Sequence, residues 1–366
     1  MPPSAWAEEH EELRAAVREL LADISPPTEV RRLMATAEGL DPVAWKRMAD
    51  LGLLGLAVPA RHGGSGLTLR EAAAVFEETG AALLCAPLFA TVALATNVLL
   101  CAGDDEAAAA FLPPIVAGEW VATVALGEGG EDATRAEPAA AGEYLLHGHM
   151  SQVLDGATAH LLLVVARAPR GTGVFAVRGD AAGLTRTPLV TMDQTRKQAG
   201  VRFDATPARL VGRQGLAPDV VRAALDRAAV ALAAEQLGGA RRCLQMAADH
   251  ACRRLQFGRP VGSFGAVKHE LAGVLVDVEA ATSVVRSAAW TAVHRPDDLP
   301  VAAAVARAWC SGAYRRAAAC NIQVHGGIGF TWDHDAHLHF KRATSSALLL
   351  GGPAAPREAV ARHLGL

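Results

Sequence analysis

The feature that most constrains the fold is one long helical sequence near the middle of the chain. The run APDVVRAALDRAAVALAAEQLGGARRCLQMAADHACRRLQF spans residues 217–257 and is rich in alanine, which has the highest helix propensity. It predicts a helix of roughly 38 residues, about 57 Å long at 1.5 Å per residue. Helical sequences follow at 265–293, 300–326 and 356–364. Long helices joined by short turns predict an antiparallel bundle.

The first part of the chain also has the pattern of helices. Residues 5–24 repeat apolar side chains at helical spacing. Asp41 followed by Pro42 is typical of an N-cap with proline in the first helical turn, and Thr68 is a second predicted cap. A short helix after Asp104 is expected to stop at Pro113 and Pro114.

Between these helical parts, short β-branched runs alternate with Gly, Asp and Pro, which predicts an antiparallel β domain. The expected fold class is therefore α+β. We predict an N-terminal all-α domain (1–118), a middle antiparallel β-barrel domain (119–214) and a C-terminal antiparallel four-helix bundle (215–366).

Composition excludes several classes of function. A net charge of −3 and a pI near 6.5 argue against a nucleic-acid partner, which a basic surface would bind. The six cysteines are scattered in apolar sequence without a C-x-x-C pair, so we expect reduced, buried thiols. The acidic start of the chain does not resemble a secretory signal. These features together favour a cytoplasmic protein.

An uncharged run at residues 81–102 is long enough to cross a bilayer. Pro87, two threonines and Asn97 interrupt it, and no basic flank or aromatic belt frames it. We therefore predict two buried helices that meet near Pro87, and no membrane partner.

Four histidines and two aspartates crowd the stretch QVHGGIGFTWDHDAHLHFKR, residues 323–342. Imidazole and carboxylate groups at this density suit zinc or iron. Against a metal site, the stretch has no His-x-x-x-His pair, the spacing typical of ligands on a helix. In the alternative interpretation, a helix begins within TWDHD, with Thr331 and Asp333 as caps and the histidines on its solvent face.

Three ordered segments resemble the acyl-CoA dehydrogenase family. Ala49–Leu69 looks like its N-terminal signature, Arg254–Val274 like its bundle signature, and residues 323–343 like the segment before its active-site loop. The resemblance covers nearly the whole chain. It implies an FAD flavoprotein that forms homotetramers or mixed tetramers of related subunits, and that oxidises acyl thioesters of CoA or of a carrier protein to the α,β-enoyl form.

The resemblance also implies cofactor-binding residues. Arg254 matches an arginine that pairs with the FAD pyrophosphate of an adjacent subunit, whereas without the motif it would be a solvated arginine. Phe257 either packs on the cofactor or only caps the helix end. Gln323, Gly326 and Gly327 match residues that lie along a neighbour's dinucleotide, where glycine lets the backbone approach closely. The family has no metal site among these histidines, so no metal is expected.

The catalytic base of the family is missing from this chain. The usual glutamate position corresponds to Leu350, and the alternative position corresponds to Ala228. Nearby Asp226 and Glu235 are better explained as solvated or interhelical charges than as bases. The catalytic residue is thus unknown, and the resemblance leaves open whether this chain acts alone.

Contacts of a subunit to its own flavin are also altered. The family's Thr-Glu-Pro becomes Gly127-Glu128-Gly129, and a tryptophan and a threonine beside the flavin ring become Gln152 and Leu154. The glutamine of the bundle signature becomes Gly265.

We therefore consider three hypotheses. In the first, the chain completes the flavin site of a related subunit that supplies the base. In the second, a homo-oligomer uses an unusual base. In the third, a non-redox or scaffold relative has lost both flavin and base.

Overall fold

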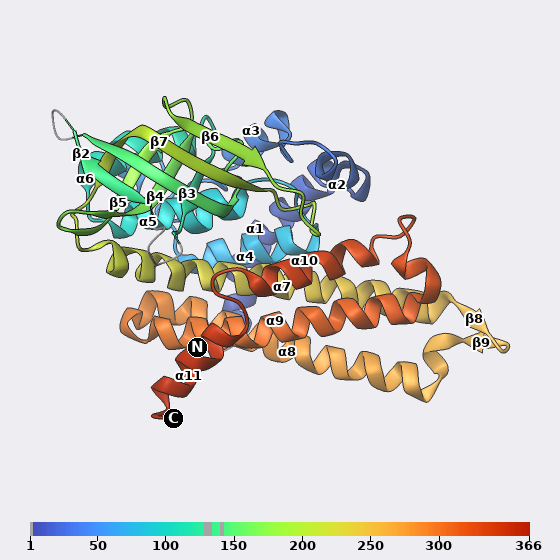
Figure 1. Cartoon of the computed structure of the whole chain (residues 1–366). Helices are drawn as coiled ribbons and strands as arrows, with labels where there is room; N and C mark the ends of the chain where they lie inside the picture. Colours follow the sequence, from blue (N-terminus) through green and yellow to red (C-terminus); the bar gives the residue numbers. More distant parts are fainter. Residues whose placement is uncertain (1–2, 128–133, 140–142) are drawn as a thin grey trace. The chain divides into compact units, whose positions relative to one another are not determined.

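The computed structural model describes residues 3–127, 134–139 and 143–366 (Figure 1). The chain forms two compact units. Unit 1 contains the residues up to Arg31 together with 69–84 and 229–366, and unit 2 contains 32–68 and 85–228. The order of element types, helices, then strands, then helices, confirms the predicted fold class. The boundaries after residues 118 and 214 stay predictions, because each unit combines segments that are far apart in the chain.

The helices of unit 2 show how local sequence determines helix ends. They are α3 (Pro42–Asp50), the 3₁₀ turn η1 (Ala60–His62), η2 (Phe89–Ala95), α5 (Thr96–Cys101) and α6 (Asp105–Val116), while α2 (Pro27–Met34) spans the boundary with unit 1. The carboxylate of Asp41 accepts hydrogen bonds from the amides of Val43 (2.8 Å) and Ala44 (3.3 Å). The predicted N-cap, with Pro42 in the first turn, is confirmed.

Helix α6 corrects one prediction, because it continues through Pro113 and Pro114 to Val116. The two prolines lie in its last turn, where their missing N–H groups leave the carbonyls of Ala109 and Ala110 without helical donors. Both alanines are exposed, so water reaches these carbonyls. The prolines therefore end the helix one turn later than expected.

The uncharged run is buried as predicted, but it contains one continuous helical segment instead of two helices that meet near Pro87. The helix α4 (Leu69–Ala81) ends before Pro87, and the π-helix η2 runs directly into α5. The hydroxyl of Thr91 in η2 donates to the carbonyl of Ala122 (3.0 Å) and accepts from its amide (3.2 Å). This pair of hydrogen bonds fixes η2 against the first strand of the sheet. Within the described part of the chain, no helix is both long and apolar enough to cross a membrane.

The strands of unit 2 form a closed sheet. They are β1 (Ala122–Ala125), β2 (Arg135–Pro138), β3 (Tyr144–Leu154), β4 (Leu161–Ala168), β5 (Gly171–Arg178), β6 (Leu184–Pro188) and β7 (Gln198–Val211). Strands pair in the cycle β4–β2–β3–β7–β5–β4, and β6 adds to β7. Most pairs are antiparallel as predicted, but β1 and β2 each pair with β4 in parallel. Closure of the ring gives each of its five strands a partner on both sides, which protects backbone groups that an open sheet would expose.

Unit 1 is a helical bundle around three long helices. It contains α1 (Pro3–Ile24), α4, α7 (Ala217–Arg253), α8 (Gly265–His294), α9 (Leu299–His325), α10 (Ala336–Leu348) and α11 (Ala354–His363), with residues 217–228 of α7 belonging to unit 2. Helix α7 has 37 residues and is the long helix that the sequence predicts. The hairpin β8 (Leu255–Gln256) and β9 (Arg259–Pro260) connects α7 to α8.

Glycines let α4, α7 and α9 pack closely. A Cβ atom at Gly238 would lie 1.7 Å from the carbonyl oxygen of Glu77, and one at Gly239 would lie 2.3 Å from the ring of Tyr314. Glu77 and Glu78 on α4 are buried, and Arg14 bonds both of them (2.5 and 2.9 Å). The helices therefore pack at backbone distance, and the buried acids are neutralised by arginine.

Candidate functional site

The candidate site lies at one end of unit 1, where α7 and α9 finish. We call residues 254–260 and 322–332 the bundle tip; it comprises the β8–β9 hairpin, the end of α9 and the 3₁₀ turn η6 (Gly326–Phe330). The ring centroids of His250 and His325 lie 4.2 Å apart, as do those of His325 and His334, and both pairs are tilted by a little over 40°. Burial, reinforced by the charge of His325, lowers the pKa of His250 and of His334. These contacts connect the end of α7, through His250, to His325 in the bundle tip and to His334 just after it.

Arg254 has a fixed backbone and an exposed side chain. Its amide donates to the carbonyl of His250 (2.8 Å), and its carbonyl accepts from the amide of Val261 (2.8 Å). Among the described residues, its guanidinium forms no hydrogen bond or ion pair, and the residue is exposed. A pre-positioned arginine of this kind is suited to binding an external anion.

Phe257 projects from the hairpin. It is 92% exposed and has a φ of 52°, in the left-handed region that costs energy for a residue with a side chain. Its ring meets Phe264 edge-on at 6.1 Å, and the following Gly258 also has positive φ. The strained turn thus presents the aromatic ring to solvent rather than burying it over the helix end.

The glycines of η6 leave the backbone open. Gly326 has φ 68° and ψ −145°, a combination that is essentially restricted to glycine. A Cβ atom at Gly326 or at Gly327 would meet nothing within 4 Å, so no neighbour within the described chain requires glycine at position 327. Gln323, one turn earlier on α9, is also exposed. The backbone at this point is accessible to a group from outside the chain.

The bundle tip also exposes large apolar side chains. Where such side chains form a contiguous patch, they mark an interaction surface. The exposed apolar residues at the bundle tip are Leu255, Phe257, Ile328, Phe330 and Trp332.

The two positions that the family resemblance predicts for the catalytic base contain no acid and differ in environment. Ala228 is fully buried in α7. Leu350 has a φ of 55° and begins a turn that continues through Gly351 and Gly352, both also at positive φ. Neither an alanine nor a leucine side chain can accept a proton.

The turn at Leu350 is held by an arginine that the sequence pattern does not reveal. Arg307 of α9 is 6% exposed and donates to the carbonyls of Leu349, Leu350 (2.7 Å) and Gly352 (3.0 Å). Burial lowers the pKa of Arg307 to about 10. One arginine within an alanine-rich helix gives no sequence signal of this role; the Gly351-Gly352 pair predicts only that a turn is near.

Glu235 and Asp226, the two acids nearest to Ala228 in the sequence, have different surroundings. Glu235 is buried and pairs with Arg342 of α10 (3.1 Å), as the interhelical interpretation predicts. Asp226 is half-buried, and burial raises the pKa of its carboxyl group. The charge of Arg222 opposes this effect of burial on Asp226.

The positions that the family resemblance predicts for contacts to the subunit's own flavin differ in exposure. Leu154 is buried within the sheet, and its carbonyl accepts from the hydroxyl of Thr123 (2.5 Å). Gln152 is exposed at a β-bulge with positive φ. Gly127 is exposed, and Gly265 is the first residue of α8. Glu128 and Gly129 lie outside the described residues.

The histidine-rich stretch corrects the predicted helix start. Helix α10 begins at Ala336, after Asp335, and neither Thr331 nor Asp333 caps it. His337 and His339 are buried instead of facing solvent, because this side of α10 packs into unit 1. Among the residues that the structure describes, no group of three or more His, Cys, Asp or Glu side chains could hold a metal ion.

The sequence matches two family descriptions, "Acyl-CoA dehydrogenase, N-terminal domain" over residues 7–119 and "Acyl-CoA dehydrogenase, C-terminal domain" over 218–365. It is 37% identical to acyl-CoA dehydrogenase IpdE2 of Mycobacterium tuberculosis, with 94% of each chain covered. A variant of the Tcur3481-Tcur3483 steroid ACAD has a TM-score of 0.89 at 32% identity, covering 98% of each chain. The ChsE4-ChsE5 complex of M. tuberculosis has a TM-score of 0.89 at 31% identity and covers 97% of each.

Proposed function

Because this chain belongs to the acyl-CoA dehydrogenase family, whose members are oxidoreductases acting on CH–CH groups, we propose that it completes the FAD site of a related subunit rather than building one alone. The proposed reaction is the α,β-dehydrogenation of an acyl thioester. The observation that carries the proposal is the guanidinium of Arg254, unpaired among the described residues, beside an open glycine backbone, in a chain without an acid at either base position.

The residues of the bundle tip fit a dinucleotide. Arg254 offers two parallel donors to pyrophosphate oxygens, and it has no acid partner within the described chain to compete for them. At Gly326 and Gly327, a phosphate or ribose can approach the backbone without meeting a side chain. Gln323 adds an exposed amide that can both donate and accept. Phe257 adds an apolar face for the cofactor or for the subunit that holds it.

FAD, when bound, would accept the hydride from the substrate's β-carbon. The part of this chain would be to bind and orient. Arg254 would hold the pyrophosphate, while the apolar residues of the bundle tip would exclude water from its surroundings. Proton removal from the α-carbon would fall to a carboxylate of the related subunit, since Leu350 and Ala228 cannot perform it.

The partner in this proposal is a second chain of the same family. It would carry an acid at the position that corresponds to Leu350, and a polar flavin contact where this chain has the buried Leu154. Two structurally similar proteins, the ChsE4-ChsE5 complex and the Tcur3481-Tcur3483 steroid ACAD, have names that each join two different chains. This supports a mixed assembly. The second name makes a steroid-derived acyl thioester the first substrate class to test. Six free thiols are consistent with assembly in a reducing cytoplasm.

The test is reconstitution of the pair. The chain would be purified alone and together with a family member that retains the acid, and the flavin absorbance and the mass of each assembly would be measured. We expect little flavin with the chain alone, and a flavin-containing mixed tetramer with the pair. In that pair, Arg254→Met should lower flavin occupancy, and Arg222→Met on the exposed part of α7 should not. A full flavin complement in the isolated chain would refute the proposal.

The apolar residues at both predicted base positions also favour a second function, a non-redox one. The same experiment tests it. A non-redox relative could keep the fold to bind a thioester or to support another subunit. It would bind no flavin with any partner. The reconstituted pair therefore separates the two functions directly.

A further inference from the structure

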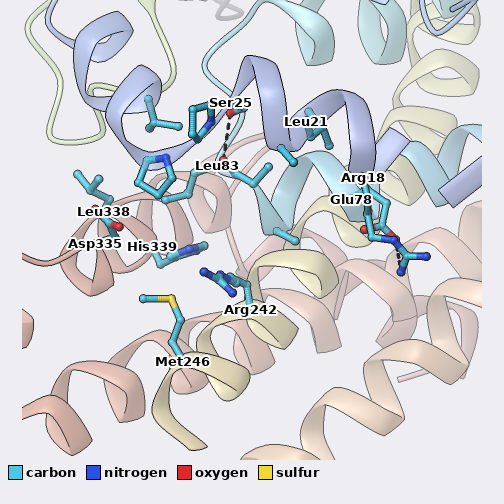
Figure 2. Close-up of a pocket in the computed structure, with 16 residues that line it drawn as sticks. Arg18, Leu21, Ser25, Glu78, Leu83, Arg242, Met246, Asp335, Leu338 and His339 are labelled. Atoms are coloured by element: carbon cyan, nitrogen blue, oxygen red, sulfur yellow. Dashed lines mark hydrogen bonds and ion pairs between the residues drawn. The ribbon is translucent and has the colours of Figure 1, made fainter. Parts of the chain in front are cut away.

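A separate cavity lies inside unit 1, away from the bundle tip. Its volume is about 400 Å³, and it is partly open to solvent. It is lined by the end of α1, the start of α2, the end of α4, the middle of α7 and the start of α10 (Figure 2). This volume falls within the usual range for small-molecule sites. The residues that line it include none from the bundle tip and none from the turn at Leu350, as far as the structure describes the chain. The cavity is therefore independent of the proposed flavin site.

The walls of the cavity are mainly apolar. Leu21, Val30, Leu83 and Leu338 face it and are buried, and the flexible side chain of Met246 closes one side. Surfaces of this kind favour a hydrocarbon over a strongly hydrated ligand. The orientation of a ligand in the cavity must then be determined by the polar groups that line it.

The acids that line the cavity are already paired. Glu78 accepts from Arg14 (2.9 Å), and Asp335 accepts from Arg31 (2.7 Å). Each carboxylate is thus neutralised by an arginine and does not attract a further cation. These acids therefore do not favour a cationic ligand.

The lining arginines differ from each other. Arg18 bonds Glu11, whereas Arg242 forms no hydrogen bond or ion pair within the part of the chain that the structure describes. Figure 2 shows the guanidinium of Arg242 directed toward the ring of His339. Among the described residues, Arg242 is therefore a cation without a counter-ion, and it lies at the edge of an apolar space.

His339 supplies a neutral polar group beside this cation. The side chain is 3% exposed, and its Nδ1 lies 3.0 Å from the hydroxyl of Tyr314. Burial, together with the charge of Arg242, lowers the pKa of His339 to about 3. At neutral pH the imidazole is uncharged, so it can hydrogen-bond a ligand without adding charge.

We propose that this cavity binds an apolar monocarboxylate of the free fatty acid class, with the carboxylate on Arg242 and the hydrocarbon between α1, α4 and α10. A carboxylate matches the guanidinium in charge and in two-pronged geometry. The alkyl chain fills the space that Leu21, Leu83, Leu338 and Met246 surround. The acid binds as such, without a thioester, flavin or partner subunit.

The test is isothermal titration of the full-length chain with octanoate and, separately, with octanol. Octanoate should bind more tightly, since only the acid pairs with Arg242. Arg242→Met should weaken octanoate by about tenfold to a hundredfold, the effect of losing one hydrogen-bonded ion pair, and should leave octanol unchanged. Arg222→Met removes an exposed arginine from the same helix and should change neither ligand.

A second variant tests the position of the hydrocarbon. Ala22→Phe places a ring at the cavity wall while leaving Arg242 in place, and it should weaken both ligands. Thermal melting of each variant without ligand verifies that it is folded. Octanoate affinity that is unaffected by both substitutions, or equal affinity for acid and alcohol, would overturn the proposal. Neither result bears on flavin binding by the pair, so the two proposals succeed or fail separately.

Discussion

Replacing Arg307 with methionine tests how the turn at Leu350 is stabilised. The guanidinium makes three hydrogen bonds to carbonyls. At about 2 kcal/mol for each bond to a charged group, they contribute about 6 kcal/mol. Burial opposes this, because a fall in the pKa of Arg307 from 12.5 to about 10 corresponds to about 3 kcal/mol. The net loss in Arg307→Met should therefore be about 3 kcal/mol.

Hydrogen exchange at the turn measures this loss directly. The amide of Gly352 donates to the carbonyl of Leu348 (3.1 Å), so its protection reports whether the turn is closed. A loss of about 3 kcal/mol should accelerate its exchange by roughly a hundredfold. Arg315→Met, an exposed position on the same helix, is the matched control and should exchange like the wild type. Unchanged protection in Arg307→Met would show that the arginine does not hold the turn.

Close packing, buried histidines and the leucine at position 350 each lead to a further prediction. Gly238→Ala should destabilise unit 1 by about 3 kcal/mol in thermal or urea unfolding, because its methyl group would overlap the facing backbone of α4, whereas Gly312→Ala, which has open space, should be neutral or stabilising. Burial lowers the pKa of His337 to about 4 and of His339 to about 3; the unfolded chain then binds more protons below pH 6.5, so stability should be constant above that pH and fall as the pH decreases toward 3. A flat unfolding midpoint from pH 7 to pH 4 would contradict this. Leu350→Glu should not make the isolated chain reduce a dye with acyl thioesters, since an acid alone does not restore the cradle, and activity in that variant would refute the need for a related subunit.

Helix periodicity and capping chemistry made much of the fold predictable. The length of α7 and the cap at Asp41 both depend on local backbone preferences, which a sequence displays directly. The predicted end of α6 was wrong because exposure of Ala109 and Ala110 to water decides whether proline can be tolerated there. Exposure depends on tertiary packing, which no local pattern displays.

In the candidate site, too, local sequence predicted some features, whereas others depend on tertiary packing. The residues of the bundle tip were identified from family motifs, and the structure adds that Arg254 lacks a partner in the described chain and that Gly326 adopts a conformation other residues avoid. The prediction that the histidines face solvent was wrong. Polar residues in a sequence usually indicate an exposed surface, but His339 is buried against Tyr314. Arg307 and Arg242 gave no signal at all, because their roles depend on carbonyls and apolar walls that come from other helices.

The wide turn of η2 has a consequence for how this region can vary. The hydrogen bonds of a π-helix span one more residue than those of an α-helix, so deleting one residue between Phe89 and Ala95 would allow an ordinary helix to form. The cost would be rotational, because each residue corresponds to about 100° around the axis. Thr91 would then swing away from Ala122, and both of its hydrogen bonds would break. A homologue shortened by one position in this segment should therefore present a different side of this helix to the sheet.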